Sequence, residues 1–180
     1  MYIEKYPGTH DLFVASSTEI NTGASTNWNP TAQTEVKWEN RTHYDASVYS
    51  HSTTSSPHVV TIEQDGNYVV MYHDELTGAV ADANVTVELV VNGSNVPCAS
   101  ARTHYISNSN GHDTTSASGF FYVPDLEVDD TVTVTVMREG VSGSVTTNNP
   151  TKLYVVRKQS LAVSDPPTVS SVVLNSSSDI

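Results

Sequence analysis

The chain has 180 residues and a mass of 19.4 kDa, enough for one domain with a single hydrophobic core. Its formal charge of −12 comes from 20 acidic residues against 8 lysines and arginines, which are scattered singly along the sequence. We therefore expect neither nucleic acid nor an anionic membrane surface as a partner, because both are bound by clustered cations. No apolar run reaches the roughly 18 residues of a membrane-spanning helix, and the N-terminal residues do not resemble a secretory signal.

Strand-forming residues dominate the sequence, with 26 Val and 22 Thr against 7 Leu and 11 Ala. Apolar and polar residues alternate in short runs along the whole chain, which predicts β-strands. In chain order, the predicted strands cover residues 12–15, 34–39, 58–62, 67–72, 85–91, 96–101, 119–123, 131–137, 141–147 and 152–157.

Four of these segments carry more specific signals. The dipeptides Asp65-Gly66 and Asn92-Gly93 each follow a predicted strand and are typical of tight turns. Residues 131–137 read TVTVTVM, so Val132, Val134 and Val136 are expected to face a core. Residues 67–72 are apolar at nearly every position, which predicts a central strand covered on both faces.

The pattern predicts an all-β fold, a single jelly-roll β-sandwich of about eight to ten antiparallel strands, with no credible helix. We expect an N-terminal arm at residues 1–10, the jelly-roll domain at 11–159 and an extended C-terminal tail at 160–180, where Pro166-Pro167 precedes a serine run. Another β-sandwich, such as an immunoglobulin-like domain, remains an alternative.

The order of several short motifs resembles a known family. A strand ending in Asn40 is followed by Tyr44-Asp45, an apolar strand at 59–62, and Gly66-Asn67-Tyr68 opening the next strand. Residues 126–132 (LEVDDTV) and the aromatic strand around Tyr154 complete the succession, with Asp129 where Gly is usual. Together they resemble the jelly-roll head of tumour necrosis factor and the complement globular domains. The segment from Tyr49 to Tyr68 also resembles phage capsid-associated proteins of this fold.

The resemblance implies a homotrimer, because family members generally pack an aromatic-rich sheet around a threefold axis. The residues expected nearest that axis are Tyr68, Tyr72, Phe120 and Tyr154. The alternative for each of them is the core of the monomer itself.

The sequence predicts no metal site and no cofactor. Seven histidines lie mostly at strand ends and in loops, and none belongs to a metal-binding motif. The weak candidates are His73 and Asp74, which a threefold axis would repeat, and Asp129 and Asp130 in an acidic turn.

An enzyme is not expected. The elbow motif Gly-x-Ser-x-Gly is absent, and the lone Cys98 lies in an apolar stretch that predicts a buried, unreactive thiol.

The function expected is that of a non-enzymatic viral structural protein: a trimeric capsid decoration, turret or fibre-head protein on the surface of a phage-like virion, bound to the major capsid protein or another virion protein. The alternative is a receptor- or glycan-binding module of a tail fibre or cell-surface assembly, which exposed aromatics such as Trp28 and Trp38 would serve. A secreted signalling ligand is a third class.

Docking to a particle is expected to use the terminal arms, each of which carries apolar residues too few to fold alone. The docking residues predicted are Tyr2, Ile3 and Tyr6 in the first arm and Val172 and Leu174 in the second.

Overall fold

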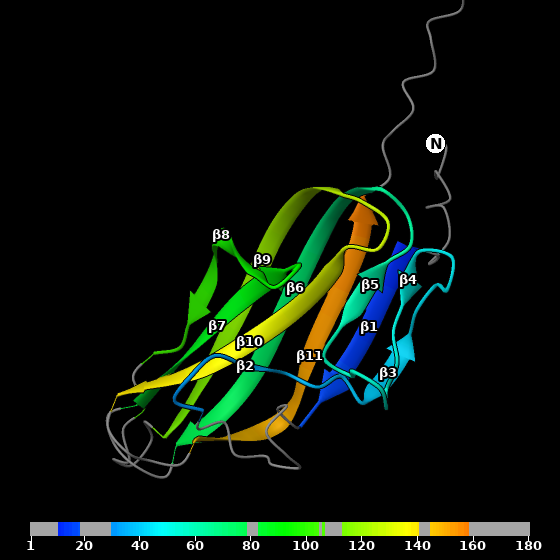
Figure 1. The fold of residues 1–180 in the computed structure, drawn as a ribbon. Coiled ribbons are helices and arrows are strands. Elements are labelled where there is room, and N and C mark those ends of the chain that lie inside the picture. The colour runs from blue at the N-terminus through cyan, green and yellow to red at the C-terminus, as the bar shows by residue number, and fades with distance from the viewer. Residues whose placement is uncertain are drawn as a thin grey trace, which may run out of the picture.

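The computed structural model describes residues 11–18, 30–78, 83–104, 106, 113–140 and 145–158. Within these residues, eleven strands form two antiparallel sheets that pack face to face, as Figure 1 shows. The first sheet has the order β3-β1-β11-β6-β9, with β1 (Leu12–Ser17), β3 (Asn40–His43), β6 (Gly66–Gly78), β9 (Thr114–Leu126) and β11 (Val145–Lys158). The second sheet has the order β4-β5-β10-β7-β8, with β4 (Tyr49–Ser50), β5 (Val60–Ile62), β7 (Ala83–Val91), β8 (Ser94–Arg102) and β10 (Thr131–Gly140), and β2 (Thr34–Glu35) also pairs with β10.

The core lies between the two sheets and is built by alternate residues of each strand. Val132, Val134 and Val136 of β10 are fully buried, as the alternation predicts, and so are Val36 and Trp38. The largest buried side chains are aromatic: Trp38, Tyr49, Tyr68, Tyr72 and Phe13. The all-β sandwich predicted from the sequence is confirmed, and no helix occurs in the described part of the chain.

The two predicted turns have different outcomes. Asn92-Gly93 joins β7 to β8 as a tight hairpin, with both residues at positive φ (51° and 74°). Asp65-Gly66 joins no hairpin, because β5 and β6 belong to different sheets. The predicted tight turn at this point is therefore a crossing from one sheet to the other.

Tyr49 fixes the end of the sandwich at which the described domain begins and ends. Its hydroxyl lies 2.8 Å from the carbonyl oxygen of Asp11 and 3.0 Å from that of Val155, and it accepts a hydrogen bond from the Arg157 N–H at 3.0 Å. Burial raises the pKa of this phenol, so it stays protonated and can donate. Since Leu12 pairs with Val156, both ends of the domain leave the sandwich side by side.

No helix in the described residues is long and apolar enough to cross a membrane.

Candidate functional site: an open apolar sheet face

The outward face of the first sheet is unusually apolar. On each of β1, β11, β6 and β9, residues that alternate with core residues point away from the core, and the strand register aligns them in two rows. One row runs Leu12, Val156, Val69, Tyr122, and the other runs Val14, Tyr154, Met71, Phe120. We refer to these eight side chains as the apolar face.

The aromatic residues of β9 are the most exposed part of the apolar face. Phe120 keeps 70% of its surface exposed and Tyr122 keeps 53%, and the described residues contain only one other large exposed hydrophobic, Val128. The next row of the same sheet is polar, with exposed Lys152 and His73 side by side. An exposed apolar patch bordered by polar residues is typical of a surface that contacts another protein.

The structure corrects half of the predicted trimer-interface residues. Phe120 and Tyr154 lie on the apolar face, but Tyr68 and Tyr72 point into the core and are essentially unexposed. On β6 the outward residues are instead Val69 and Met71, one position away from each predicted tyrosine. Because successive strand residues point to opposite faces, an error of one position moves a side chain from the surface to the interior.

The remaining members of the apolar face, Leu12, Val14, Tyr122 and Val156, were also missing from the sequence-based set. Alternation alone could have placed Tyr122 on the same face as Phe120, and Val156 on the same face as Tyr154, since residues two apart in a strand share a face. The face of β6 that lies beside these residues is set by the register of β6 with β9 and β11. The sequence of a single strand does not contain this register.

Asp74, a weak metal candidate, is instead an interior carboxylate. It is completely buried, accepts a 2.6 Å hydrogen bond from the Tyr72 hydroxyl, and accepts a second from the Ala117 N–H at 2.8 Å. Burial raises the pKa of Asp74, and burial together with the nearby carboxylate raises that of Tyr72. The pair is therefore a structural hydrogen bond of the core.

The other metal candidates do not come together in one group either. His73 lies on the outer surface, with its Nδ1 2.8 Å from Ser118 Oγ. Asp129 and Asp130 follow the end of β9, where the Asp130 carboxylate accepts bonds from Asn92 Nδ2 (2.6 Å) and the Glu127 N–H (2.8 Å). No group of three metal-ligating side chains occurs among the described residues. The acidic turn thus connects the β9–β10 loop to the β7–β8 hairpin.

Two further sequence-based predictions are wrong. Cys98 is exposed, because residues 96–99 bulge out of β8 between the pairs Val90–Asn95 and Glu88–Ser100. Trp38 is fully buried, so it is not available to a glycan or a receptor. Trp28 and the docking residues Tyr2, Ile3, Tyr6, Val172 and Leu174 lie outside the described residues.

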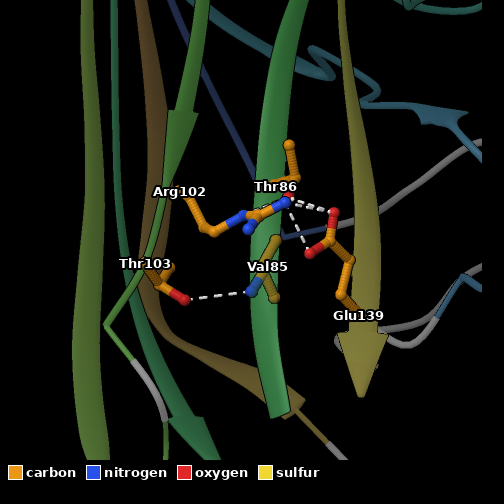
Figure 2. A network of polar contacts seen from close by, with 5 residues as sticks. All are labelled: Val85, Thr86, Arg102, Thr103 and Glu139. Atoms are coloured by element: carbon orange, nitrogen blue, oxygen red, sulfur yellow. Dashed lines mark hydrogen bonds and ion pairs between the residues drawn. The ribbon is translucent and has the colours of Figure 1, made fainter.

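Edge strand β8 is held to the second sheet by a polar network, shown in Figure 2. The Arg102 guanidinium lies 2.7 and 2.6 Å from the two carboxylate oxygens of Glu139, and Thr86 donates to the same carboxylate at 3.0 Å. Beside it, Thr103 Oγ1 accepts from the Val85 N–H at 2.9 Å. The side chains of Arg102, Thr86 and Glu139 therefore link β8, β7 and β10.

Comparison of the sequence with known protein families and with curated proteins finds no match. Solved structures with the same fold include murine APRIL (12% identity, TM-score 0.55, 82% of this chain and 99% of that one). They also include the PRD1 vertex protein P5 (13%, 0.56, 85% and 100%) and the globular domain of zebrafish complement 1qA protein (13%, 0.55, 82% and 96%). The chain is thus similar in fold to both groups of the resemblance, and the predicted jelly roll is confirmed.

Proposed function

We propose that this protein is a non-enzymatic structural component of a phage-like virion, displayed on the particle surface as a homotrimer. The observation that carries the proposal is the apolar face, which leaves Phe120 and Tyr122 largely exposed on one protomer. Burying these side chains against further copies of the chain removes apolar surface from water, at about 25 cal/mol per Å².

A second copy of the chain is the occupant that best fits the apolar face. Its centre carries no charged side chain, and Lys152, His73 and the exposed Lys158 lie at its margin. Obligate interfaces have this arrangement of an apolar centre and a polar rim. Closure around a threefold axis is the arrangement that the resemblance to the tumour necrosis factor and complement domains implies, and cyclic closure leaves no apolar face open.

The virion assignment is supported by the similarity to the PRD1 vertex protein, which covers 85% of this chain. It also fits the composition of the chain, which is acidic overall and rich in Thr and Ser. A protein displayed outward on a particle needs a solvated surface and an attachment point, and it needs no reactive group.

Attachment to the particle is proposed to use the terminal arms. Both ends of the described domain leave the sandwich at the same place, beside the Leu12–Val156 pair, so residues 1–10 and the tail start from one end of the molecule. The opposite end would then point away from the particle. The N-terminal arm is proposed to contact a capsid or other virion protein, and the C-terminal arm a neighbouring subunit.

The experiment is to purify particles of the virus that encodes the chain and to detect the protein in them by mass spectrometry. Full-length protein added to particles stripped of it should co-sediment with them. A variant lacking residues 1–9 should keep its oligomeric mass but no longer co-sediment. Absence of the protein from purified particles contradicts the virion assignment, whereas full co-sedimentation of the truncated variant contradicts only the N-terminal arm as the anchor.

A further inference from the structure

A shallow groove crosses the outward face of the second sheet, on the opposite side of the sandwich from the apolar face. Its volume is about 360 Å³, which is at the lower end of the range for small-molecule sites. The groove is lined by Gln33, Glu35, His58, Val59, Val90, Gly93, Asn95, Thr131, Thr133 and Thr135.

The strand arrangement explains why the groove exists. Along one side of β10 the neighbouring strand changes: Thr131 and Val132 pair with β5, whereas Thr135 and Val136 pair with β2. Thr133 lies between these two pairings, at the middle of the groove floor. The Asn92-Gly93 hairpin contributes Gly93 and Asn95 to the lining from the other side.

The floor presents a hydroxyl group that nothing in the protein satisfies. Thr133 is only 9% exposed and its hydroxyl makes no hydrogen bond within the described structure, whereas the Thr135 hydroxyl lies 3.5 Å from the carbonyl oxygen of Glu88. The Thr133 hydroxyl is not among the fully buried polar atoms of the described residues, so it is reached from the groove. A ligand that supplies a donor or an acceptor can therefore take the place of water at this hydroxyl.

The lining also restricts the charge of the ligand. Glu35 is the acidic residue of the groove, no Lys or Arg is among its described lining residues, and the chain carries a net charge of −12. An anionic ligand such as a phosphate or a sialic acid is therefore disfavoured. Hydroxyl and amide side chains alternate with the small apolar surfaces of Val59 and Val90, which suits a ligand with hydroxyl groups at its edge and C–H groups on its faces.

We propose that this groove binds a neutral saccharide ring. The site itself belongs to a single protomer; only the expectation that three copies act together rests on the proposed trimer. Because the apolar face and the groove lie on different sheets, a trimer would leave three grooves open, and binding to a surface bearing many glycans would gain from avidity.

The test is to titrate the full chain with the methyl glycosides of glucose, galactose, mannose and N-acetylglucosamine at millimolar concentration, and to follow the backbone amides by NMR. At least one of these neutral sugars should shift the amides of Thr131, Thr133 and Asn95, and N-acetylneuraminic acid should not. If none of the four shifts these amides, the proposal is wrong.

Two threonine variants separate the groove from the rest of the surface. Thr133→Val removes the unpaired hydroxyl at nearly constant volume and should weaken sugar binding about three- to tenfold, the loss expected for one hydrogen bond. Thr114→Val is the matched control, since Thr114 is an exposed strand residue of the other sheet whose hydroxyl makes no hydrogen bond within the described residues, and the variant should bind as the unmodified chain does. Unchanged affinity in Thr133→Val would overturn the proposal. The oligomeric mass measured on the same samples distinguishes this outcome from failure of the trimer.

Discussion

Asp74 shows how a single residue links the interior to solution pH. Its carboxyl group is buried between the Tyr72 hydroxyl and the Ala117 N–H, and burial raises its pKa above the ordinary value of 3.8. At pH values between the Asp74 pKa of the unfolded chain and its higher pKa in the folded protein, the folded state binds more protons than the unfolded state. The stability contributed by Asp74 is therefore present at low pH and is lost as pH rises through the folded-state pKa.

We predict that Asp74→Asn raises the free energy of unfolding at neutral pH, because the variant removes the cost of the buried charge that raises the pKa of Asp74. The asparagine Oδ1 can still accept from the Ala117 N–H, its Nδ2 can donate to the Tyr72 hydroxyl in place of the bond that the carboxylate accepts, and the side chain carries no buried charge. Thermal unfolding measured from acidic to neutral pH should show the gain at neutral pH and its disappearance in acid. Asp125→Asn is the control, because Asp125 carries an exposed carboxyl at positive φ. This variant should change the stability neither at neutral pH nor in acid. Equal stabilities of Asp74→Asn and the unmodified chain at every pH would refute this interpretation.

Two neighbouring residues of β10 test the assignment of its faces. Val134 is fully buried, so Val134→Ala should cost on the order of 1–2 kcal/mol through lost burial and a small cavity. Thr133 points to the groove and its hydroxyl makes no hydrogen bond within the described residues, so Thr133→Ala should lower the free energy of unfolding by less than Val134→Ala does. Denaturant titration of the two variants measures the difference, and equal losses would contradict a one-sided strand.

At the residue scale, the sequence predicts best where one face alone is apolar. The core residues of the TVTVTVM segment were predicted correctly because its valines are apolar and its threonines are polar. Residues 67–72 are apolar on both faces, so their alternation does not distinguish Tyr68 from Val69, and Tyr68 and Tyr72 were assigned to the wrong face. Cys98 was misplaced because a bulge of the backbone is set by pairing with β7.

At the scale of elements, β8 illustrates how an exposed edge is managed. It ends the second sheet, and its bulge at residues 96–99, which includes Pro97 and a Cys98 with φ of 63°, interrupts the regular pattern of backbone groups that another chain could pair with. Its C-terminal part is attached through the network of Arg102, Glu139 and Thr86 in Figure 2.

We predict that Arg102→Met loosens this edge without unfolding the domain. The ion pair is partly exposed (57% and 30% for the two side chains), so after solvent screening its loss should cost less than about 1 kcal/mol. Hydrogen exchange of the β8 amides should become faster, up to about fivefold, while amides of β6 in the same sample keep their rates. A uniform change in both strands would show that the pair stabilises the whole molecule instead of its edge.

Local signals predict local elements. The Asn92-Gly93 hairpin forms as expected because two residues at positive φ suffice to define it. Asp65-Gly66 carries a similar signal, yet β5 pairs with β4 and β10 while β6 pairs with β9 and β11, so the choice of sheet is decided by distant strands. The short strands β3 and β4 were not predicted, since four and two residues are too few to show a period.

At the scale of the whole molecule, the order of motifs identified the jelly roll, which the similarity to solved structures confirms at 12–13% identity. What the order of motifs could not provide is the composition of the outward faces, because these depend on the register of four strands at once. The register brings residues of β1, β6, β9 and β11 into one apolar face, through which the trimer is proposed to form.

The measurement that tests this account most directly is the mass of the protein in solution, by sedimentation equilibrium at micromolar concentration. The unmodified chain should have three times the 19.4 kDa of one chain, and Phe120→Lys should reduce the mass to that of the monomer because the trimer would bury three uncompensated charges. Val128→Lys, which alters an exposed apolar residue outside the apolar face, should remain trimeric. A monomeric unmodified chain, or a Phe120→Lys variant that stays trimeric, would contradict assembly through the apolar face.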